Sequence, residues 1–209
     1  MIDILENHTD LITARDENCY DMVKEFKNAR FAVCPALFAS KEQKLRKGLK
    51  NIGIVLQSPK GGIHSIPETV YKTYYKEFEV LENKFQTTYI ANYIDDYLFL
   101  RKRGQEVLYS SYSEDYIDIM NNYDLVVSTR VHGCGLASSL GIPNILIPHD
   151  GRYTTAIKFK SHIIKGELSL SELVKNISIE KESQQIIDYK AEQKEIFKEI
   201  IQKNMIDNL

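Results

Sequence analysis

The residues best suited to chemistry lie in one segment, residues 123–152, which reads YDLVVSTRVHGCGLASSLGIPNILIPHDGR. Arg130 carries a planar guanidinium that matches a carboxylate or a phosphate, and His132 can donate, accept or transfer a proton near neutral pH. Gly133 allows a helix to begin beside them, and the N–H groups of a helix N-terminus favour an anion. This pattern predicts an anion site with a proton donor. In the simpler alternative, Arg130 pairs with an acidic residue and His132 caps the helix.

Three further cations follow other predicted strands. Lys60 lies in a glycine-rich loop that lacks the Walker spacing, and a flexible turn is an equal alternative. Arg152 either contacts an anion or stays solvated in a turn. Arg15 either reaches the same site or pairs with one of the two acidic residues that follow it. We assign Lys60 and Arg152, together with Gly133, to substrate binding.

The cysteines do not indicate a reactive or metal-binding centre. Cys134 follows His132, but no Cys–His–Asn arrangement is recognisable and the neighbouring residues are small, which favours a buried, unreactive thiol. The three cysteines, Cys19, Cys34 and Cys134, are far apart and have no CxxC spacing. The sequence therefore predicts reduced thiols, with neither a zinc site nor a disulfide framework.

Short apolar runs alternate with longer amphipathic ones, a pattern typical of β–α–β units around a parallel sheet. The expected strands are residues 11–14, 31–33, 52–57, 87–91, 107–110, 125–128 and 144–147. The expected helices are residues 17–27, 67–83, 95–103, 113–121, 133–140, 169–176 and 181–203. In the strand order 3-2-1-4-5, the first strand after residue 50 lies beside the fourth, which ends near Arg130. We therefore predict an α/β protein with a Rossmann-like parallel sheet and flanking helices.

A shift in composition suggests the domain organisation. Residues 40–50, SKEQKLRKGLK, hold five basic residues and one acid, and a clean strand pattern restarts after them. We expect an incomplete N-terminal unit plus a linker in residues 1–50 and a C-terminal Rossmann-like domain in residues 51–178. Residues 179–209 should form a helix that packs back on the N-terminal part. The two strands of the first unit are too few for an independent core.

Composition excludes several classes of protein. The 209 residues include 27 basic and 29 acidic ones, a net charge of −2, which excludes the basic field of a nucleic-acid binder. Hydrophobic residues make up 43% and charged residues 27%, which excludes wholesale disorder. No run approaches the roughly 20 apolar residues of a membrane span, and the acidic start does not resemble a signal peptide. We expect a cytoplasmic protein whose basic linker is either solvated or peripheral at the inner face of the membrane.

Three stretches resemble one family. DLVVSTRVHGCGLASSLGIPNILIPHDGR resembles the C-terminal signature of polysaccharide pyruvyl transferases, an Arg-x-His followed by a small-residue helix and Gly-Ile-Pro. ITARDENCYDMVKEF is similar to the arginine-bearing strand–helix step of that family, and VCPALF to the run after it. The likeness covers most of residues 10–152, and Arg130-Val131-His132 is its most specific part.

The resemblance implies a GT-B-like fold with the active site in a cleft, in which residues 1–50 are a remnant of the N-terminal Rossmann-like domain. It implies transfer of the enolpyruvyl unit of phosphoenolpyruvate to two hydroxyls of a cell-surface polysaccharide sugar, which gives a cyclic ketal. Phosphoenolpyruvate is then a co-substrate, no cofactor is needed, and the saccharide acceptor is free or lipid-linked. By position, Arg130 and His132 bind the carboxylate and phosphate of the donor, with His132 as general acid and Arg15 as a third catalytic residue.

Two other functions stay open. A GT-B nucleotide-sugar glycosyltransferase needs an acidic residue near the C-terminal part of the fold to hold the ribose, and no convincing candidate is present. A non-catalytic half-protein would instead bind a partner or an anionic ligand. This alternative arises because the first part of the family's N-terminal domain has no counterpart before Met1. The chain would then be a fragment, a half completed by a partner, or an inactive member.

The incomplete N-terminal unit leads to a prediction about assembly. Exposed strand edges invite pairing with another chain, and two strands need further cover to be stable in water. We predict a homodimer or larger assembly with residues 1–40 near the interface. Light scattering at micromolar concentration should give at least twice the mass of one chain. A monomeric mass together with normal cooperative unfolding would contradict the prediction.

Overall fold

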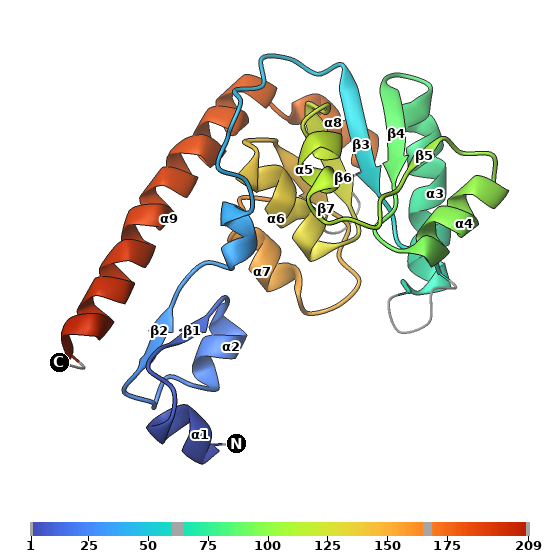
Figure 1. The fold of residues 1–209 in the computed structure, drawn as a ribbon. Coiled ribbons are helices and arrows are strands. Elements are labelled where there is room, and N and C mark those ends of the chain that lie inside the picture. The colour runs from blue at the N-terminus through green and yellow to red at the C-terminus, as the bar shows by residue number, and fades with distance from the viewer. Residues whose placement is uncertain (1, 60–64, 165–168, 208–209) are drawn as a thin grey trace.

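The computed structural model describes residues 2–59, 65–164 and 169–207. Its strands form two parallel sheets, one of two strands and one of six (Figure 1). The small sheet contains β1 (Ile12–Ala14) and β2 (Ala29–Phe31). The large sheet contains β3 (Asn51–Val55), β4 (Gln86–Ile90), β5 (Val107–Leu108), β6 (Leu125–Ser128), β7 (Asn144–Leu146) and β8 (His162–Ile163).

The strands of the large sheet run in the order β5-β4-β3-β6-β7-β8, and all neighbouring pairs are parallel. The predicted order of the first five strands is confirmed. Val55 of β3 pairs with Ser128 of β6, so the segments after these two strands leave the sheet side by side. The strand β8 was not predicted, because two residues are too few to show a periodic pattern.

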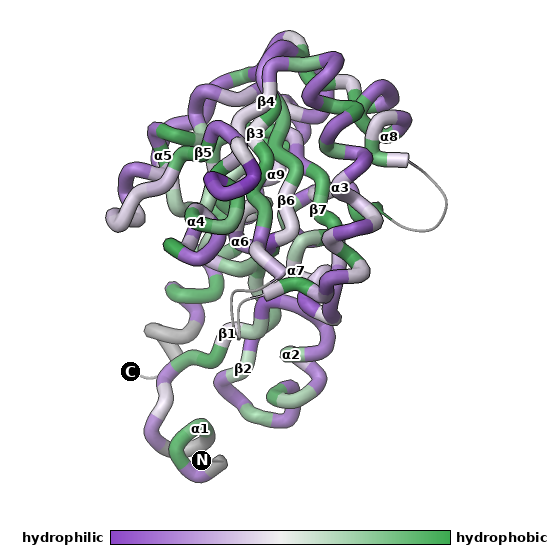
Figure 2. The backbone as a smooth tube through the Cα atoms, turned by 90° about the vertical axis from the view of Figure 1, so that its right-hand side faces the viewer, coloured by the Kyte–Doolittle hydropathy of each residue, from purple (hydrophilic) through white to green (hydrophobic). Residues whose placement is uncertain are grey.

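Helices cover both faces of the large sheet. They are α3 (Glu68–Glu82), α4 (Ile94–Lys102), α5 (Asp115–Met120), α6 (Val131–Ser139) and α8 (Leu170–Asn176). Ile54 packs in a cluster with residues of α3 and α8, whereas the next residue, Val55, packs with residues of α5 and α6. Burial on both faces explains why the strands are apolar without alternation. Figure 2 shows hydrophobic residues concentrated on the central strands.

The other described helices lie outside these two layers or at their edges. They are α1 (Ile2–Asn7), α2 (Glu17–Asp21), the 3-10 helix η1 (Pro35–Phe38), α7 (Tyr153–Ile157) and α9 (Ile179–Asp207). Among the described residues, no helix combines the length and the apolar character needed to cross a bilayer.

The N-terminal unit differs from its prediction in two places. The expected strand 31–33 begins two residues earlier and ends at Phe31, because Val33 and Cys34 leave the sheet and are buried beside Leu37 and Phe159. The expected helix 17–27 ends at Asp21 and gives way to turns. Packing against the large domain thus overrides the local hydrophobic pattern.

Polar contacts hold the small sheet against α7. Asp16 caps α2 by accepting a hydrogen bond from the N–H of Cys19, and its second oxygen accepts one from Thr155 at 2.7 Å. Burial raises the pKa of Asp16, but these hydrogen bonds outweigh it and the net pKa is lowered. Glu17 pairs with Lys158 at 2.6 Å. These contacts hold Asp16 and Glu17 in place, and they thereby fix the position of Arg15, the residue that precedes Asp16.

The linker runs along α9 on its way to β3, as Figure 1 shows. Lys190 of α9 is buried and donates to the carbonyls of Ser40 at 2.7 Å and Ser139 at 2.6 Å. Ser183 accepts a hydrogen bond from the N–H of Arg46 at 3.0 Å. The long C-terminal helix therefore contacts both the linker and the end of α6.

A glycine in α6 allows the close approach of η1 and α7. A Cβ at Gly135 would lie 2.9 Å from the Cβ of Ala36 and 2.9 Å from the ring of Phe159. We predict that Gly135→Ala lowers the free energy of unfolding by about 1–2 kcal/mol, because overpacking outweighs the gain in helix propensity. Urea denaturation measures the change. A Cβ at Gly48 meets no atom within 4 Å, so Gly48→Ala is the matched control and should not destabilise; equal losses in both variants would contradict the packing argument.

Candidate active site

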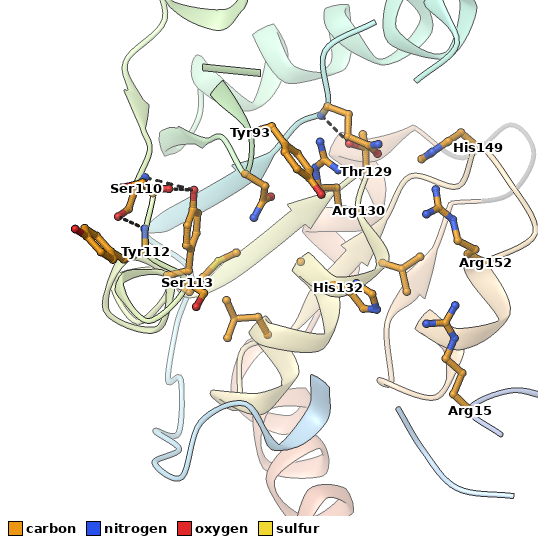
Figure 3. Close-up of a pocket in the computed structure, with 18 residues that line it drawn as sticks. Arg15, Tyr93, Ser110, Tyr112, Ser113, Thr129, Arg130, His132, His149 and Arg152 are labelled. Atoms are coloured by element: carbon orange, nitrogen blue, oxygen red, sulfur yellow. Dashed lines mark hydrogen bonds between the residues drawn. The ribbon is translucent and has the colours of Figure 1, made fainter. Parts of the chain in front are cut away.

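A cavity of about 600 Å³ lies at the carboxyl edge of the large sheet. Its lining comes from the segments that follow β3, β4, β5, β6 and β7, together with one residue after β1. The lining residues are Arg15, Gln57, Asn92, Tyr93, Ser110, Ser111, Tyr112, Ser113, Tyr116, Met120, Thr129, Arg130, Val131, His132, Gly133, Leu136, His149 and Arg152 (Figure 3). Ligands of open α/β sheets bind at this edge, near the point where the strand order reverses.

The structure brings most of the candidate residues from the sequence together. Arg15, Arg130, His132, Gly133 and Arg152 all line the cavity. The N–H of Gly133 donates to the carbonyl of Arg130, and a Cβ on Gly133 would lie 2.5 Å from Ser128 Oγ. Gly133 therefore contributes by having no side chain, which leaves room for Ser128 Oγ.

One candidate cannot be placed. Lys60, assigned above to substrate binding, lies outside the described residues. Its role stays a prediction.

The turn after β6 aims Arg130 at the cavity. Ser128 Oγ accepts a hydrogen bond from the N–H of Arg130 at 2.9 Å and donates to its carbonyl at 2.7 Å. Arg130 is the extended residue that precedes α6. The side chain of Ser128 thus closes a tight strand-to-helix turn that fixes the backbone of the arginine.

A buried carboxylate restrains the guanidinium of Arg130. Nη2 of Arg130 donates to Asp96 at 2.6 Å, and the side chains are 14% and 2% exposed, respectively. The other oxygen of Asp96 accepts the N–H of Ser58 at 2.7 Å. The ring of Tyr93 covers the guanidinium at 4.5 Å. Within the described residues, Nε of Arg130 is buried and has no hydrogen-bond partner.

His132 projects from the first turn of α6 and is exposed to the cavity. Partial desolvation by the cavity walls lowers the pKa of His132, and the positive charges of Arg15 and Arg152 lower it further. Figure 3 shows these two arginines at the same end of the cavity as the His132 ring. An unliganded site therefore favours the neutral imidazole at pH 7.

The other two arginines each have an acidic neighbour. Nε of Arg15 lies 3.8 Å from Asp16, and the Arg15 side chain is 37% exposed. Arg152 donates to Asp150 through Nε at 2.9 Å and through Nη2 at 2.6 Å. These contacts orient the arginines and leave their outer faces toward the cavity.

Among the described residues, the lining of the cavity presents cations and no carboxylate. Three arginines line it together with two histidines whose lowered pKa values favour the neutral form, and none of the lining residues within the described chain is acidic. Asp16, Asp96 and Asp150, which pair with the arginines, do not line the cavity. Such an arrangement binds an anion without first having to assemble the cations.

Sequence reasoning missed Asp96, Tyr93 and His149. Asp96 follows another acidic residue, Asp95, at the start of an expected helix, and the sequence alone does not show which of the two is buried. His149 lies in a turn between more prominent residues. Burial lowers the pKa of His149, Asp150 raises it, and the nearby arginines lower it again, with a net decrease.

No cysteine lines the cavity, and no metal centre is found among the described residues. Cys134 is buried, and desolvation raises the pKa of its thiol to about 12, which disfavours the reactive thiolate. No group of three or more His, Cys, Asp or Glu side chains in residues 2–59, 65–164 and 169–207 could hold a metal ion.

The sheet order defines a Rossmann-like α/β fold, as the sequence predicted, and the comparison with solved structures confirms the GT-B-like fold that the family resemblance implied. A solved structure with this fold is the UDP-GlcNAc 2-epimerase of Methanocaldococcus jannaschii in complex with UDP-GlcNAc and UDP. It has a TM-score of 0.55 and 12% identity over 86% of this chain and 60% of that chain. A glycotransferase of kitacinnamycin gives a TM-score of 0.46 and 11% identity over 92% of this chain and 54% of that one. This chain therefore spans no more than about 60% of either relative.

The chain belongs to the polysaccharide pyruvyl transferase family. The family model, described as polysaccharide pyruvyl transferase, matches residues 1–151, which include Arg15, Arg130 and His132. A comparison with curated proteins gives no match. The family resemblance read from the sequence is thereby confirmed.

The pair of Asp96 and Arg130 leads to a prediction about stability. We predict that Asp96→Asn lowers the free energy of unfolding by about 3 kcal/mol, because a buried guanidinium loses its counter-charge. Saturating inorganic phosphate should then stabilise the variant more than the wild-type protein, since the anion replaces the lost charge. Urea denaturation with and without phosphate measures both effects. Asp95→Asn is the matched control at an exposed position, and a loss equal to that of Asp96→Asn would refute the role of the pair.

Proposed function

We propose that the protein transfers the enolpyruvyl unit of phosphoenolpyruvate to two hydroxyls of one sugar in a cell-surface polysaccharide or its lipid-linked precursor. The product is a cyclic ketal that carries a carboxylate. Family membership supports a saccharide acceptor. The observation that carries the proposal is the placement of Arg15, Arg130, His132 and Arg152 around one cavity without an acidic lining residue among those described.

The donor fits this arrangement by charge. Phosphoenolpyruvate carries a carboxylate and a phosphate on the same enol carbon, and arginine forks bind both groups well. Arg130 lines the cavity, and the exposed faces of Arg15 and Arg152 supply further donors at separate points of it. The two anionic groups can therefore be held at the same time, which fixes the enol carbon between them.

His132 is the proton donor in the proposed reaction. It protonates the methylene carbon of phosphoenolpyruvate, which leaves positive charge on the carbon that carries the phosphate. A sugar hydroxyl adds to that carbon and gives its proton back to His132. The second hydroxyl then displaces the phosphate, which leaves with the hydroxyl proton. The products are the ketal and inorganic phosphate.

The electrostatics of the site link donor binding to protonation. In the free protein, Arg15 and Arg152 help to lower the pKa of His132. A bound anion offsets both positive charges, so the pKa of His132 rises when the donor binds. The general acid is thus charged mainly when its substrate is present.

The proposal is tested by product formation. Incubation with phosphoenolpyruvate and a panel of saccharides should release phosphate and give a ketal methyl group detectable by NMR. Thermal-shift measurements should show stabilisation by phosphoenolpyruvate and none by nucleotide sugars. Stabilisation by nucleotide sugars alone would instead favour the alternative function, a nucleotide-sugar glycosyltransferase. Absence of phosphate release with every acceptor would contradict catalysis by this chain.

The link between binding and protonation gives a separate prediction. Phosphoenolpyruvate should bind with proton uptake, and the uptake should be largest at pH values between the lowered pKa of free His132 and its raised pKa in the complex. Calorimetry in buffers of different ionisation enthalpy measures it. His132→Gln should reduce the uptake, whereas His8→Gln, which changes an exposed histidine outside the cavity, should not. Equal uptake in wild type and His132→Gln would remove His132 from the proton path.

A further inference from the structure

The cavity has two chemically different halves. Figure 3 shows Arg15, His132, His149 and Arg152 at one side and the tyrosines and serines at the other. We call the second side the hydroxyl wall; it consists of Asn92, Tyr93, Ser110, Ser111, Tyr112 and Ser113. None of these residues is charged, and the reaction scheme above uses none of them.

We propose that the hydroxyl wall is the subsite for the pyranose ring of the acceptor saccharide. The proposal rests on the proposed function for the role of that saccharide as acceptor. The chemistry of the ligand, a neutral ring rich in hydroxyls, is inferred from the uncharged polar and aromatic residues of the hydroxyl wall.

The cavity has room for two ligands. Its volume of about 600 Å³ is typical of pockets that enclose drug-sized molecules, and phosphoenolpyruvate has only three carbons. A donor held by the arginines occupies one end. The hydroxyl wall then lies beside the donor, where the attacking hydroxyls of a sugar must be.

Two aromatic rings on the wall are exposed to an unusual degree. The side chain of Tyr112 is 68% exposed and that of Tyr93 is 43% exposed. Aromatic rings with a polar tip are typical of binding surfaces, because they offer an apolar face and a hydrogen-bonding hydroxyl together. The C–H face of a pyranose ring packs on such a ring while its hydroxyls reach polar neighbours.

Hydrogen bonds hold the loop that carries Tyr112. The hydroxyl of Tyr116 donates to the carbonyl of Ala91 at 2.5 Å and accepts the N–H of Ser110 at 3.3 Å. Oγ of Ser110 accepts the N–H of Tyr112 at 3.0 Å. The ends of β4 and β5 are thus tied together, and the backbone of the loop that carries Tyr112 is positioned before any ligand arrives. Such preorganisation lowers the entropic cost of binding.

One polar atom on the wall lacks a partner. Oδ1 of Asn92 is buried and accepts no hydrogen bond within the described residues. A buried acceptor without a donor is costly, and a rotation of the Asn92 side chain toward the cavity would let a sugar hydroxyl supply the donor without bringing a charge. The ring of Tyr93, which covers the guanidinium of Arg130, marks where the two halves meet.

The test measures saccharide binding directly. Calorimetry or saturation-transfer NMR with methyl glycosides of neutral hexoses and N-acetylhexosamines identifies the ligands. Tyr112→Ala should raise the Kd of the bound saccharide about 3- to 10-fold, whereas Tyr112→Phe keeps the ring and should change it less. Met22→Ala removes another highly exposed apolar side chain, outside the cavity, and should have no effect. Inorganic phosphate affinity is measured in parallel and should be the same in all variants.

The outcomes separate this proposal from the proposed function. Loss of saccharide affinity in Tyr112→Ala supports the subsite even if phosphoenolpyruvate does not bind or react, a result that would contradict only the proposed function. Phosphate binding without any saccharide binding at millimolar concentration would overturn the proposed subsite and leave the donor site intact. Saccharide binding that Tyr112→Ala does not change would also overturn the proposed subsite. Binding of uridine monophosphate that depends on Tyr112, without saccharide binding, would also overturn it and assign the wall to a nucleotide.

Discussion

A buried carboxylate and a partly buried guanidinium meet at the carboxyl edge of the large sheet, where Asp96 of α4 accepts a hydrogen bond from Arg130 at 2.6 Å. The same carboxylate accepts the N–H of Ser58, so three segments, those after β3, β4 and β6, converge on one side chain. A lone charge at this depth would be strongly destabilising, and each partner therefore requires the other. The geometry of the cavity depends on this pair, because it decides where the remaining donors of Arg130 point and how the ring of Tyr93 lies across them.

The same logic extends to the other cations. Asp16 stands beside Arg15 and Asp150 beside Arg152, and both arginines still line the cavity. The acidic partners orient the arginines but do not themselves line the cavity. The placement of these cations is therefore set by packing before any ligand binds, and the pKa of His132 is lowered by desolvation and then by the charges of Arg15 and Arg152. In the proposed site, the arginines offer charge at one end, and the uncharged hydroxyl wall is left to a different kind of ligand.

The sequence predicted the parts of this structure that depend on neighbouring residues. The apolar run of β6, the glycines after it and the Arg-x-His between them lie within a few residues, so the strand, the helix and the two side chains could be placed together. The burial of Asp96 could not, since it depends on a contact with a residue 34 positions away. The position of Arg15 depends on the hydrogen bond between Asp16 and Thr155, 139 positions apart. Tyr112 was missed because the exposure of a ring on a loop is decided by tertiary packing, which the neighbouring residues do not show.

The contact between Lys190 and the carbonyl of Ser40 joins residues 150 positions apart. A ribosome makes the chain from the N-terminus at roughly 5–20 residues per second, so the linker is complete many seconds before its partner helix exists. During that interval β3 to β7 can pair, but the linker that leads to the small sheet has no α9 to lie against. Arg15 thus takes its place at the cavity only after Thr155 and Lys158, which hold the segment that follows it, have been made. The order of translation therefore delays the assembly of a charged pocket until its scaffold has formed.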